Sequence, residues 1–157
     1  MPNPPSLDAY DTRILAELQA DARLSWAELS RRVHLSQPAV TERVKKLESA
    51  GVITGYRATV SLAALGYGIR ALVRVGRTEY TRMVHLIGQL PEVVGAWNIT
   101  GEDSWELEIA VADVPHLDAV VSQLCLLGET STSIILKTLR EHQSMLPRVP
   151  PAPEPTP

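Results

Sequence analysis

The chain has 157 residues and three net negative charges; 45% of its residues are hydrophobic, 21% are charged and none is phenylalanine. These proportions are typical of folded proteins and exclude a disordered chain, and the length allows one large domain or two small ones. The sequence has no apolar run long enough to cross a membrane and no signal-peptide pattern at its start, so we expect a cytoplasmic protein with no membrane partner. The single cysteine, Cys125, has no neighbour suited to a disulfide or a metal site, and we expect no metal and no cofactor.

Prolines mark the two ends of the chain. Nine of the twelve prolines lie within residues 2–5 and 147–157, and proline-rich segments are typically extended and do not form a packed core. We therefore predict a first domain over residues 7–60, a linker over 61–68 and a second domain over 69–142. Residues 143–157 are predicted to form a disordered, proline-rich tail.

Three helices are predicted within residues 7–60. Their N-terminal caps are Asp8 or Asp11 for the first, the capping box Ser25-Trp26-Ala27-Glu28 for the second, and Ser36, followed by Pro38 in the first turn, for the third. Their apolar faces are Ile14, Leu15 and Leu18, then Leu29 and Val33, then Val40, Val44 and Leu47. The third helix should end at Gly51. Residues 52–60 are predicted to form a hairpin or an extended arm with a glycine turn, which could serve as a small wing.

The short connection between the second and third helices is typical of a helix-turn-helix, whose second helix enters the major groove of DNA. Residues 31–46 hold five Lys or Arg against one Glu, although the chain as a whole is acidic. Such a local patch can bind phosphates, and short or amide side chains can approach base edges. We therefore predict that double-stranded DNA is contacted by Arg31, Arg32, Ser36, Gln37, Pro38, Ala39, Thr41, Glu42, Arg43, Lys45 and Lys46. The same pattern also fits a solvated helix in a small bundle.

The order of residues across this first segment is specific. The relevant positions are Leu7, Asp8, Asp11, Ile14, Leu15, Leu18, Asp21, Arg23, Glu28, Leu29, Ser30, Arg32, Val33, Leu35, Ser36, Val40, Arg43, Val44, Leu47, Glu48, Gly51, Val52, Ile53, Gly55 and Tyr56. Together they resemble the DNA-binding half of the Lrp/AsnC, or feast/famine, transcriptional regulators. The resemblance implies a winged helix-turn-helix domain. His34 stands where the family usually has glycine, and histidine tolerates a left-handed backbone better than most residues.

The second segment alternates between strand and helix patterns. Strands are predicted over residues 69–76, 93–100, 105–111 and 130–139, and helices over residues 83–90 and after the cap Asp113. The order βαββαβ is that of a ferredoxin-like fold, with two helices on one face of a four-stranded antiparallel sheet. The predicted fold class is therefore α+β, with a winged helix-turn-helix domain followed by a ferredoxin-like domain.

The other face of this sheet should carry Arg70, Leu72, Arg74, Glu106, Glu108 and Ala110. The first and third strands are neighbours in this topology, so the arginines and glutamates can pair across the sheet. The face is either a solvated surface with exposed ion pairs or, as the family resemblance implies, a homodimer interface from which tetramers or octamers are built.

The family resemblance also implies an amino-acid effector site between dimers. The matching residues are Gly101, Glu102, Asp103 and Ser104 in the loop between the second and third strands, and Thr130 and Thr132 in the last strand. Ser104 replaces an aspartate of the usual Gly-Asp-x-Asp pattern. Backbone amides, hydroxyls and a carboxylate can bind both ends of a free amino acid. The alternative is a plain hairpin turn beside a threonine-rich strand.

The function that we predict is a sequence-specific DNA-binding transcriptional regulator whose DNA binding or assembly responds to an amino acid. The alternatives are an oligomeric, DNA-binding architectural protein without an effector, an assembly protein, or a small ferredoxin-like enzyme. The sequence offers no paired nucleophile and general base and no phosphate-binding glycine loop. We therefore expect no enzymatic activity.

Overall fold

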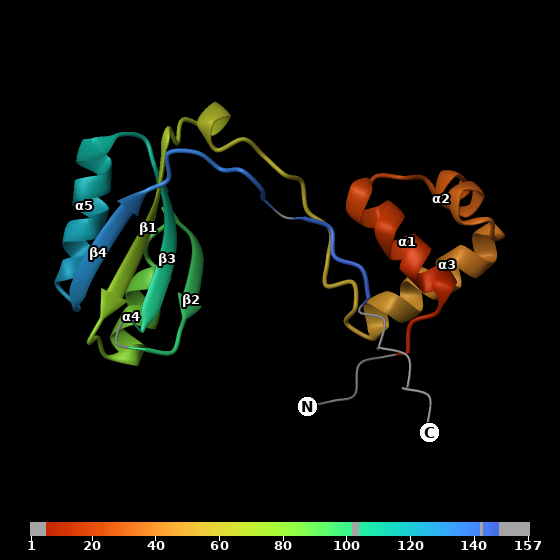
Figure 1. Ribbon diagram of the computed structural model, residues 1–157, viewed down its shortest axis with the longest axis horizontal. Coiled ribbons are helices and arrows are strands. Elements are labelled where there is room, and N and C mark those ends of the chain that lie inside the picture. The colour runs from red at the N-terminus through yellow and green to blue at the C-terminus, as the bar shows by residue number, and fades with distance from the viewer. Residues whose placement is uncertain (1–5, 102–103, 142, 148–157) are drawn as a thin grey trace, which may run out of the picture. The chain divides into compact units, whose positions relative to one another are not determined.

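The computed structural model describes residues 6–101, 104–141 and 143–147, and the chain divides into two units (Figure 1). The first unit comprises Met1–Ala58 together with Arg140–Pro157, and the second comprises Thr59–Leu139. The segment predicted as a linker thus belongs to the second unit. The described residues 140, 141 and 143–147 belong to the first unit.

Three helices form the first unit: α1 (Ala9–Ala20), α2 (Trp26–Val33) and α3 (Gln37–Ser49). Each begins at a predicted cap, because the side chains of Asp8, Ser25 and Ser36 accept hydrogen bonds from amides of the first helical turn. One apolar residue of α1, two of α2 and three of α3 form the buried core, namely Ile14, Leu29, Val33, Val40, Val44 and Leu47. The predicted helices and their apolar faces are confirmed.

Two residues with left-handed backbones lie at the ends of the second and third helices. His34 ends α2 with φ of 58°, and its amide donates to carbonyl groups of the last turn. Gly51 comes just after the end of α3 with φ of 68°, which glycine adopts without a Cβ penalty. The turn therefore forms with histidine in place of glycine, and the predicted end of α3 is confirmed.

The wing expected after α3 is not formed, because residues 52–60 contain no helix or strand. The amides of Val52 and Ile53 donate to the carbonyl of Leu47, at 2.9 Å and 3.1 Å. Both side chains pack against the core of the first unit. Because these two amides cap α3, they are not available for pairing in a hairpin. The segment over residues 52–60 instead forms the extended arm that was the alternative prediction.

The second unit is a four-stranded antiparallel sheet with the strand order β2-β3-β1-β4 (Figure 1). Its elements are η1 (Ala63–Leu65), β1 (Ile69–Gly76), α4 (Tyr80–Ile87), β2 (Val93–Asn98), β3 (Trp105–Val111), α5 (Val114–Cys125) and β4 (Glu129–Ile134). The predicted βαββαβ order is confirmed. The last strand, β4, ends at Ile134 and is shorter than the predicted 130–139. It pairs with β1, which begins at Ile69, so after the hydrogen bond from the Ile135 amide to the Arg70 carbonyl there are few β1 backbone groups left for residues 136–139 to pair with.

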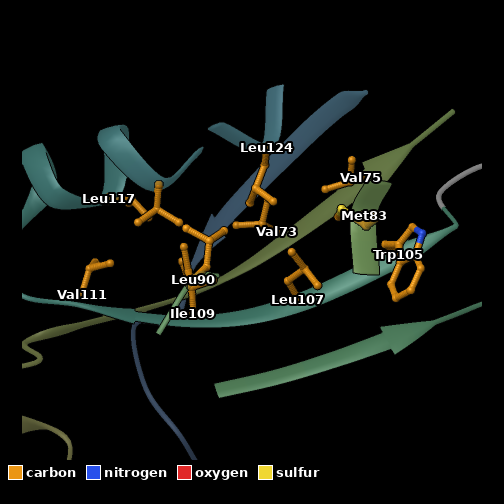
Figure 2. Close-up of a cluster of buried hydrophobic side chains, with 12 residues drawn as sticks. Val73, Val75, Met83, Leu90, Trp105, Leu107, Ile109, Val111, Leu117 and Leu124 are labelled. Atoms are coloured by element: carbon orange, nitrogen blue, oxygen red, sulfur yellow. The ribbon is translucent and has the colours of Figure 1, made fainter. Parts of the chain in front are cut away.

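Apolar side chains fill the space between the sheet and its two helices (Figure 2). Val73 of β1 and Leu107 of β3 are fully buried and point toward Met83 of α4 and Leu124 of α5. Burial of a side chain of this size stabilises a fold by roughly 1.5–3 kcal/mol. This core therefore fixes both helices of the second unit on one face of the sheet, and among the described residues of this unit no helix covers the other face, which we call the uncovered face.

A polar contact joins the start of β2 to α5. Nε2 of His116 lies 3.0 Å from Oε1 of Glu92, and Nδ1 of His116 accepts from the amide of Ala112 at 3.4 Å. An amide can only donate, so Nε2 carries the proton and donates it to the Glu92 carboxylate. Hydrogen bonding to His116 is the main reason that the pKa of Glu92 lies below its usual range.

This contact predicts a pH-dependent contribution to stability. A carboxyl group whose pKa is lowered by folding stabilises the fold above its unfolded pKa of about 4.3, and the contribution is lost as the pH falls through the folded value. We expect Glu92→Gln to lower the free energy of unfolding by about 1 kcal/mol at pH 7 and the difference from wild type to shrink toward zero at pH 3. Urea unfolding at the two pH values measures it. A difference of equal size at both would show that ionised Glu92 is not its source.

Part of the segment predicted as a tail forms hydrogen bonds with α1. Residues 143–147 pack with the first unit, where Nε2 of Gln19 donates to the carbonyl of Met145 at 2.8 Å and the Met145 amide donates to Oε1 of Gln19 at 2.9 Å. The sequence does not predict these hydrogen bonds, because no local pattern indicates which distant backbone group an exposed glutamine on α1 will bind. His142 and residues 148–157 lie outside the described residues.

Candidate nucleic-acid interface and ligand-binding site

The exposed side of α3 carries the side chains predicted to read DNA. Gln37, Pro38, Glu42 and both lysines are exposed, whereas Ala39 and Thr41 are half-buried. The hydroxyl of Thr41 donates to the carbonyl of Gln37 at 2.9 Å, which fixes its rotamer. Ser36 is occupied as the N-terminal cap, since its hydroxyl accepts from the Ala39 amide at 3.4 Å.

The basic residues of this patch differ in how far they are already engaged. Arg32 bridges Glu17 and Glu28 with N–O distances of 2.9 Å and 2.7 Å, and Arg31 also pairs with Glu28. Lys46 has a loose ion pair with Glu42 at 3.9 Å. The side chains of Arg31 and Lys46 are 75% and 74% exposed, and exposed pairs of this kind exchange readily for phosphate contacts, whereas the side chain of Arg32 is 43% exposed.

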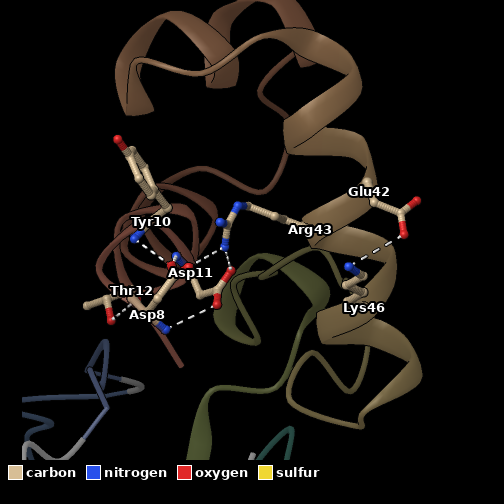
Figure 3. A network of polar contacts seen from close by, with 7 residues as sticks. All are labelled: Asp8, Tyr10, Asp11, Thr12, Glu42, Arg43 and Lys46. Carbon is tan, nitrogen blue, oxygen red and sulfur yellow. Dashed lines mark hydrogen bonds and ion pairs between the residues drawn. The ribbon is translucent and has the colours of Figure 1, made fainter. Parts of the chain in front are cut away.

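Arg43 is more buried than Arg31, Arg32 and Lys46, with a side chain that is 30% exposed, and it contacts two carboxylates of the first helix and its cap (Figure 3). Its Nη1 lies 2.7 Å from Oδ2 of Asp8 and 2.7 Å from Oδ1 of Asp11, both of α1 or its cap. Its guanidinium also lies 5.4 Å from the centroid of the Tyr10 ring, a distance suited to a cation–π contact. The sequence shows the two acids as helix caps, and their contact with Arg43 is a tertiary contact that no local pattern predicts.

The two carboxylates in this cluster are held by backbone as well as by Arg43. Oδ1 of Asp8 accepts from the amides of Tyr10 and Asp11 at 2.8 Å and 2.9 Å, and Oδ2 of Asp11 accepts from the Asp8 amide at 3.2 Å. The bond from the Asp11 amide is the largest reason that the pKa of Asp8 lies below its usual range, and Arg43 lowers it further. The same carboxylates raise the pKa of Arg43.

Ion pairs cross the uncovered face of the sheet in the second unit. Nε of Arg70 donates to Oε1 of Glu108 at 3.0 Å, and Arg74 lies 3.8 Å from Glu106. The predicted pairing of these arginines and glutamates is therefore confirmed. Leu72 lies between them, opposite Glu108 of β3 and Ser133 of β4 in the strand register.

Trp97 of β2 also lies on this face. It is paired with Glu106 in the register and is 51% exposed, whereas Trp105 is buried. A Cβ atom at Gly95 would lie 2.5 Å from Cη2 of Trp97, so glycine leaves room for the ring to lie over the sheet. The spacing of Gly95 and Trp97 on one strand face is the sequence signal for this arrangement.

The predicted effector residues lie at one end of the sheet. Trp105, next to the loop, pairs with Val75 of β1, which pairs with Thr130 of β4. Adjacent strands are about 4.8 Å apart, so the loop and the start of β4 in one chain are separated by about 10 Å. Within one chain, the described residues Ser104 and Thr130 are therefore not in contact.

The groups at this end of the sheet differ in exposure and in their hydrogen bonds. Gly101 is exposed with φ of 121°, and Ser104 is half-buried with its carbonyl accepting from Ile99 at 2.9 Å and from Asn98 at 2.8 Å. Thr132 is exposed, and Oγ1 of Thr130 lies 2.9 Å from Sγ of Cys125. Glu102 and Asp103 lie outside the described residues. The backbone carbonyl of Ser104 thus stabilises the loop by accepting these two hydrogen bonds.

Metal-binding clusters and membrane-spanning helices are both absent from the described part of the chain. Among the described residues, no group of three or more His, Cys, Asp or Glu could hold a metal ion. No helix among them is long and apolar enough to cross a membrane.

Comparison with known proteins gives consistent matches for both units. Family models for the AsnC-type helix-turn-helix domain and for the Lrp/AsnC ligand binding domain match residues 7–48 and 70–145. The leucine-responsive regulatory protein of Rhizobium meliloti is 36% identical over 141 residues, which are 86% of this chain and 90% of that protein.

Solved structures give the same result. LrpC of Bacillus subtilis has a TM-score of 0.82 at 32% identity, covering 87% of this chain and 99% of that chain. The transcriptional regulator NMB0573 of Neisseria meningitidis, solved as a complex with L-methionine, has a TM-score of 0.82 at 30% identity and covers 89% of this chain and 96% of that chain.

Proposed function

Since this chain belongs to the Lrp/AsnC family of transcriptional regulators, we propose that it regulates transcription by placing α3 in the major groove of operator DNA in response to an amino acid. The observation that carries the proposal is the exposed side of α3, where Gln37, Thr41 and Lys45 succeed each other at intervals of four residues in a helix-turn-helix. Gln37 and Thr41 are the base-reading residues in this proposal. The curated relatives are transcriptional regulators, and we assign no enzymatic activity to the chain.

The remaining residues of the patch have supporting roles. Lys45 and Lys46 bind phosphates, as do Arg31, which is 75% exposed, and Arg32, which is 43% exposed, after exchange of their ion pairs. Ser36 and Pro38 shape the start of the helix, Ala39 allows close approach to DNA, and Glu42 can accept from cytosine.

The phosphate contacts predict a change in salt dependence. Lys45→Ala and Lys46→Ala should each weaken binding to all DNA sequences and flatten the slope of log affinity against log salt by roughly one unit. Fluorescence titrations of operator and unrelated duplexes over a range of salt concentrations measure both effects. Lys137→Ala, which removes the same charge from an exposed position in the second unit, is the matched control. Slopes equal to that of the control would remove these lysines from the interface.

We also propose that the effector site is shared between chains. Ser104, beside Trp105, and Thr130 lie two strands apart, or about 10 Å, which is too far in one chain for them to bind the two ends of a free amino acid together. A second copy can supply the missing half, which links ligand binding to assembly. L-methionine, the ligand of the similar Neisseria meningitidis regulator, is the first probe for this site.

Two substitutions should separate the ligand response from DNA binding. Thr132→Val removes a hydroxyl and Glu102→Gln removes a charge, each with little change of size, so both variants should still bind the operator. We expect L-methionine to change the DNA affinity of the wild type by roughly fivefold or more and that of the variants by less than about twofold. DNA titrations with and without the amino acid measure this change. If L-methionine does not change the affinity of the wild type, the titrations are repeated with other amino acids. A full response in both variants would place the effector site elsewhere.

The assembly that we propose is a homodimer formed through the uncovered face of the sheet, with dimers joining into tetramers or octamers. A single helix-turn-helix reads few base pairs, and two-fold pairing doubles the site. The place of action proposed for such a regulator is the cytoplasm, where operator DNA is accessible. An architectural protein without an effector is the second candidate, favoured by Ser104 at the position of the expected aspartate.

A further inference from the structure

The cluster of Asp8, Asp11 and Arg43 gives this arginine a role different from that of the lysines on the same helix. We propose that Arg43 is a positioning residue, which fixes α3 on α1 for DNA binding and does not itself contact DNA. The inference rests on the proposed function, because it concerns how the DNA-reading helix is held.

The two carboxylates divide their oxygens between two tasks. Oδ1 of Asp8 and Oδ2 of Asp11 accept from backbone amides in a capping box at the start of α1, while Oδ2 of Asp8 and Oδ1 of Asp11 bind Arg43 (Figure 3). The backbone bonds thus fix the direction of the oxygens that face α3. Arg43 is held at a defined point of α1 rather than by flexible surface acids.

Burial and charge both oppose a second role for Arg43 at DNA. Its side chain is 30% exposed, and those of Asp11 and Asp8 are 15% and 50% exposed, whereas the side chain of Lys46 is 74% exposed. One guanidinium between two carboxylates leaves the cluster with a net negative charge. Both ion pairs use Nη1, so a phosphate that took this nitrogen would break them and leave two unpaired carboxylates beside the DNA, where they would repel it.

Arg43 also provides directional contacts for α3, which its apolar contacts do not. Val40, Val44 and Leu47 bury this helix against α1 and α2, but apolar contacts are not directional. Two ion pairs to one nitrogen, with the Tyr10 ring 5.4 Å from the guanidinium, restrict rotation of α3 about its axis. Such a rotation would move Gln37 and Thr41 away from the base edges.

The two roles make opposite predictions for Asp11→Asn. Asparagine keeps an oxygen for the amide of Asp8 and so preserves the cap, but it weakens the hold on Arg43 and makes the protein more positive by one charge. If Arg43 positions α3, operator affinity should fall by roughly five- to tenfold and the ratio of operator to unrelated-DNA affinity should fall with it. If Arg43 contacts phosphate, freeing it should make DNA binding tighter.

The experiment compares full-length variants in titrations of operator and unrelated duplexes at several salt concentrations. Asp21→Asn is the control: it makes the same charge change at the other end of α1, where the carboxylate accepts from the local Arg23 amide at 2.8 Å and pairs with no cation among the described residues. Asp8→Asn serves in addition if thermal melts show that Asp11→Asn is poorly folded. Arg43→Gln should weaken operator binding without the unit change in salt slope expected for Lys45→Ala.

The expected result is weaker and less selective binding by Asp11→Asn than by Asp21→Asn, with an unchanged salt slope for Arg43→Gln. Tighter binding by Asp11→Asn, or a slope for Arg43→Gln flattened by about one unit, would overturn the inference and return Arg43 to the phosphate contacts. A wild type that prefers no DNA sequence would instead refute the proposed function, so the two failures are distinguishable.

Discussion

Leu72→Asp is expected to convert the assembly to monomers and to weaken operator binding by roughly a hundredfold, because two linked half-site contacts gain about that factor or more over one. Leu72 lies at the centre of the uncovered sheet face, flanked in the register by Glu108 and Ser133. In the homodimer, the aspartate introduced at this position would be buried close to the same aspartate of the second chain, and no additional cation would neutralise the pair.

Sedimentation at micromolar concentration and DNA titration test this expectation together. Leu126→Asp is the matched control, since Leu126 is an apolar residue of the same unit, 80% exposed, that comes directly after α5 and is not on a strand. The control should remain dimeric and bind DNA like the wild type. A dimer that persists with Leu72→Asp would mean that the chains associate through another surface.

Gly128→Ala is expected to lower the free energy of unfolding by about 1–3 kcal/mol, the usual cost of overpacking. A Cβ atom at this position would collide with the carbonyl oxygen of Gly76 and would touch Val75 and Thr78. Backbone cannot yield as a flexible side chain can, so the start of β4 must move away from the end of β1. Thr130 lies only two residues further on, and the ligand response should weaken as well.

Gly88→Ala provides the control, because the nearest atoms to a Cβ atom there are carbonyl oxygens of the same turn at 3.5 Å and 3.6 Å, which is ordinary contact. Its free energy of unfolding should stay within about 0.5 kcal/mol of the wild type. Urea unfolding of both variants checks the pair. Equal stabilities would show that the connection into β4 has more room than its geometry indicates.

Much of the fold could be predicted because its signals are local. Side-chain caps at Asp8, Ser25 and Ser36, apolar faces at helical spacing and the end of α3 at Gly51 each depend on residues a few positions apart. The pairing of Arg70 with Glu108 could be predicted from the topology once the strand order was known. The family resemblance gave the same two-domain organisation.

The features that could not be predicted depend on contacts between distant residues. In the sequence, Arg43 is a basic residue within a basic helix and so is predicted to contact DNA. The tertiary structure shows that it forms ion pairs with Asp8 and Asp11. The amides of Val52 and Ile53 cap α3 instead of pairing in a wing. The bonds between Gln19 and Met145 join residues that are 126 positions apart.

The most direct test of the central proposal, that α3 reads operator DNA, is a selection of genomic fragments by the purified full-length protein and by its Gln37→Ala and Thr41→Ala variants, each with and without L-methionine. The wild type should enrich a two-fold symmetric sequence, and each variant should change the preferred base at a defined position in each half-site, at a cost of roughly 1–3 kcal/mol. Enrichment of the same sequence by both variants as by the wild type would contradict the account, because α3 would then not be the element that reads the DNA.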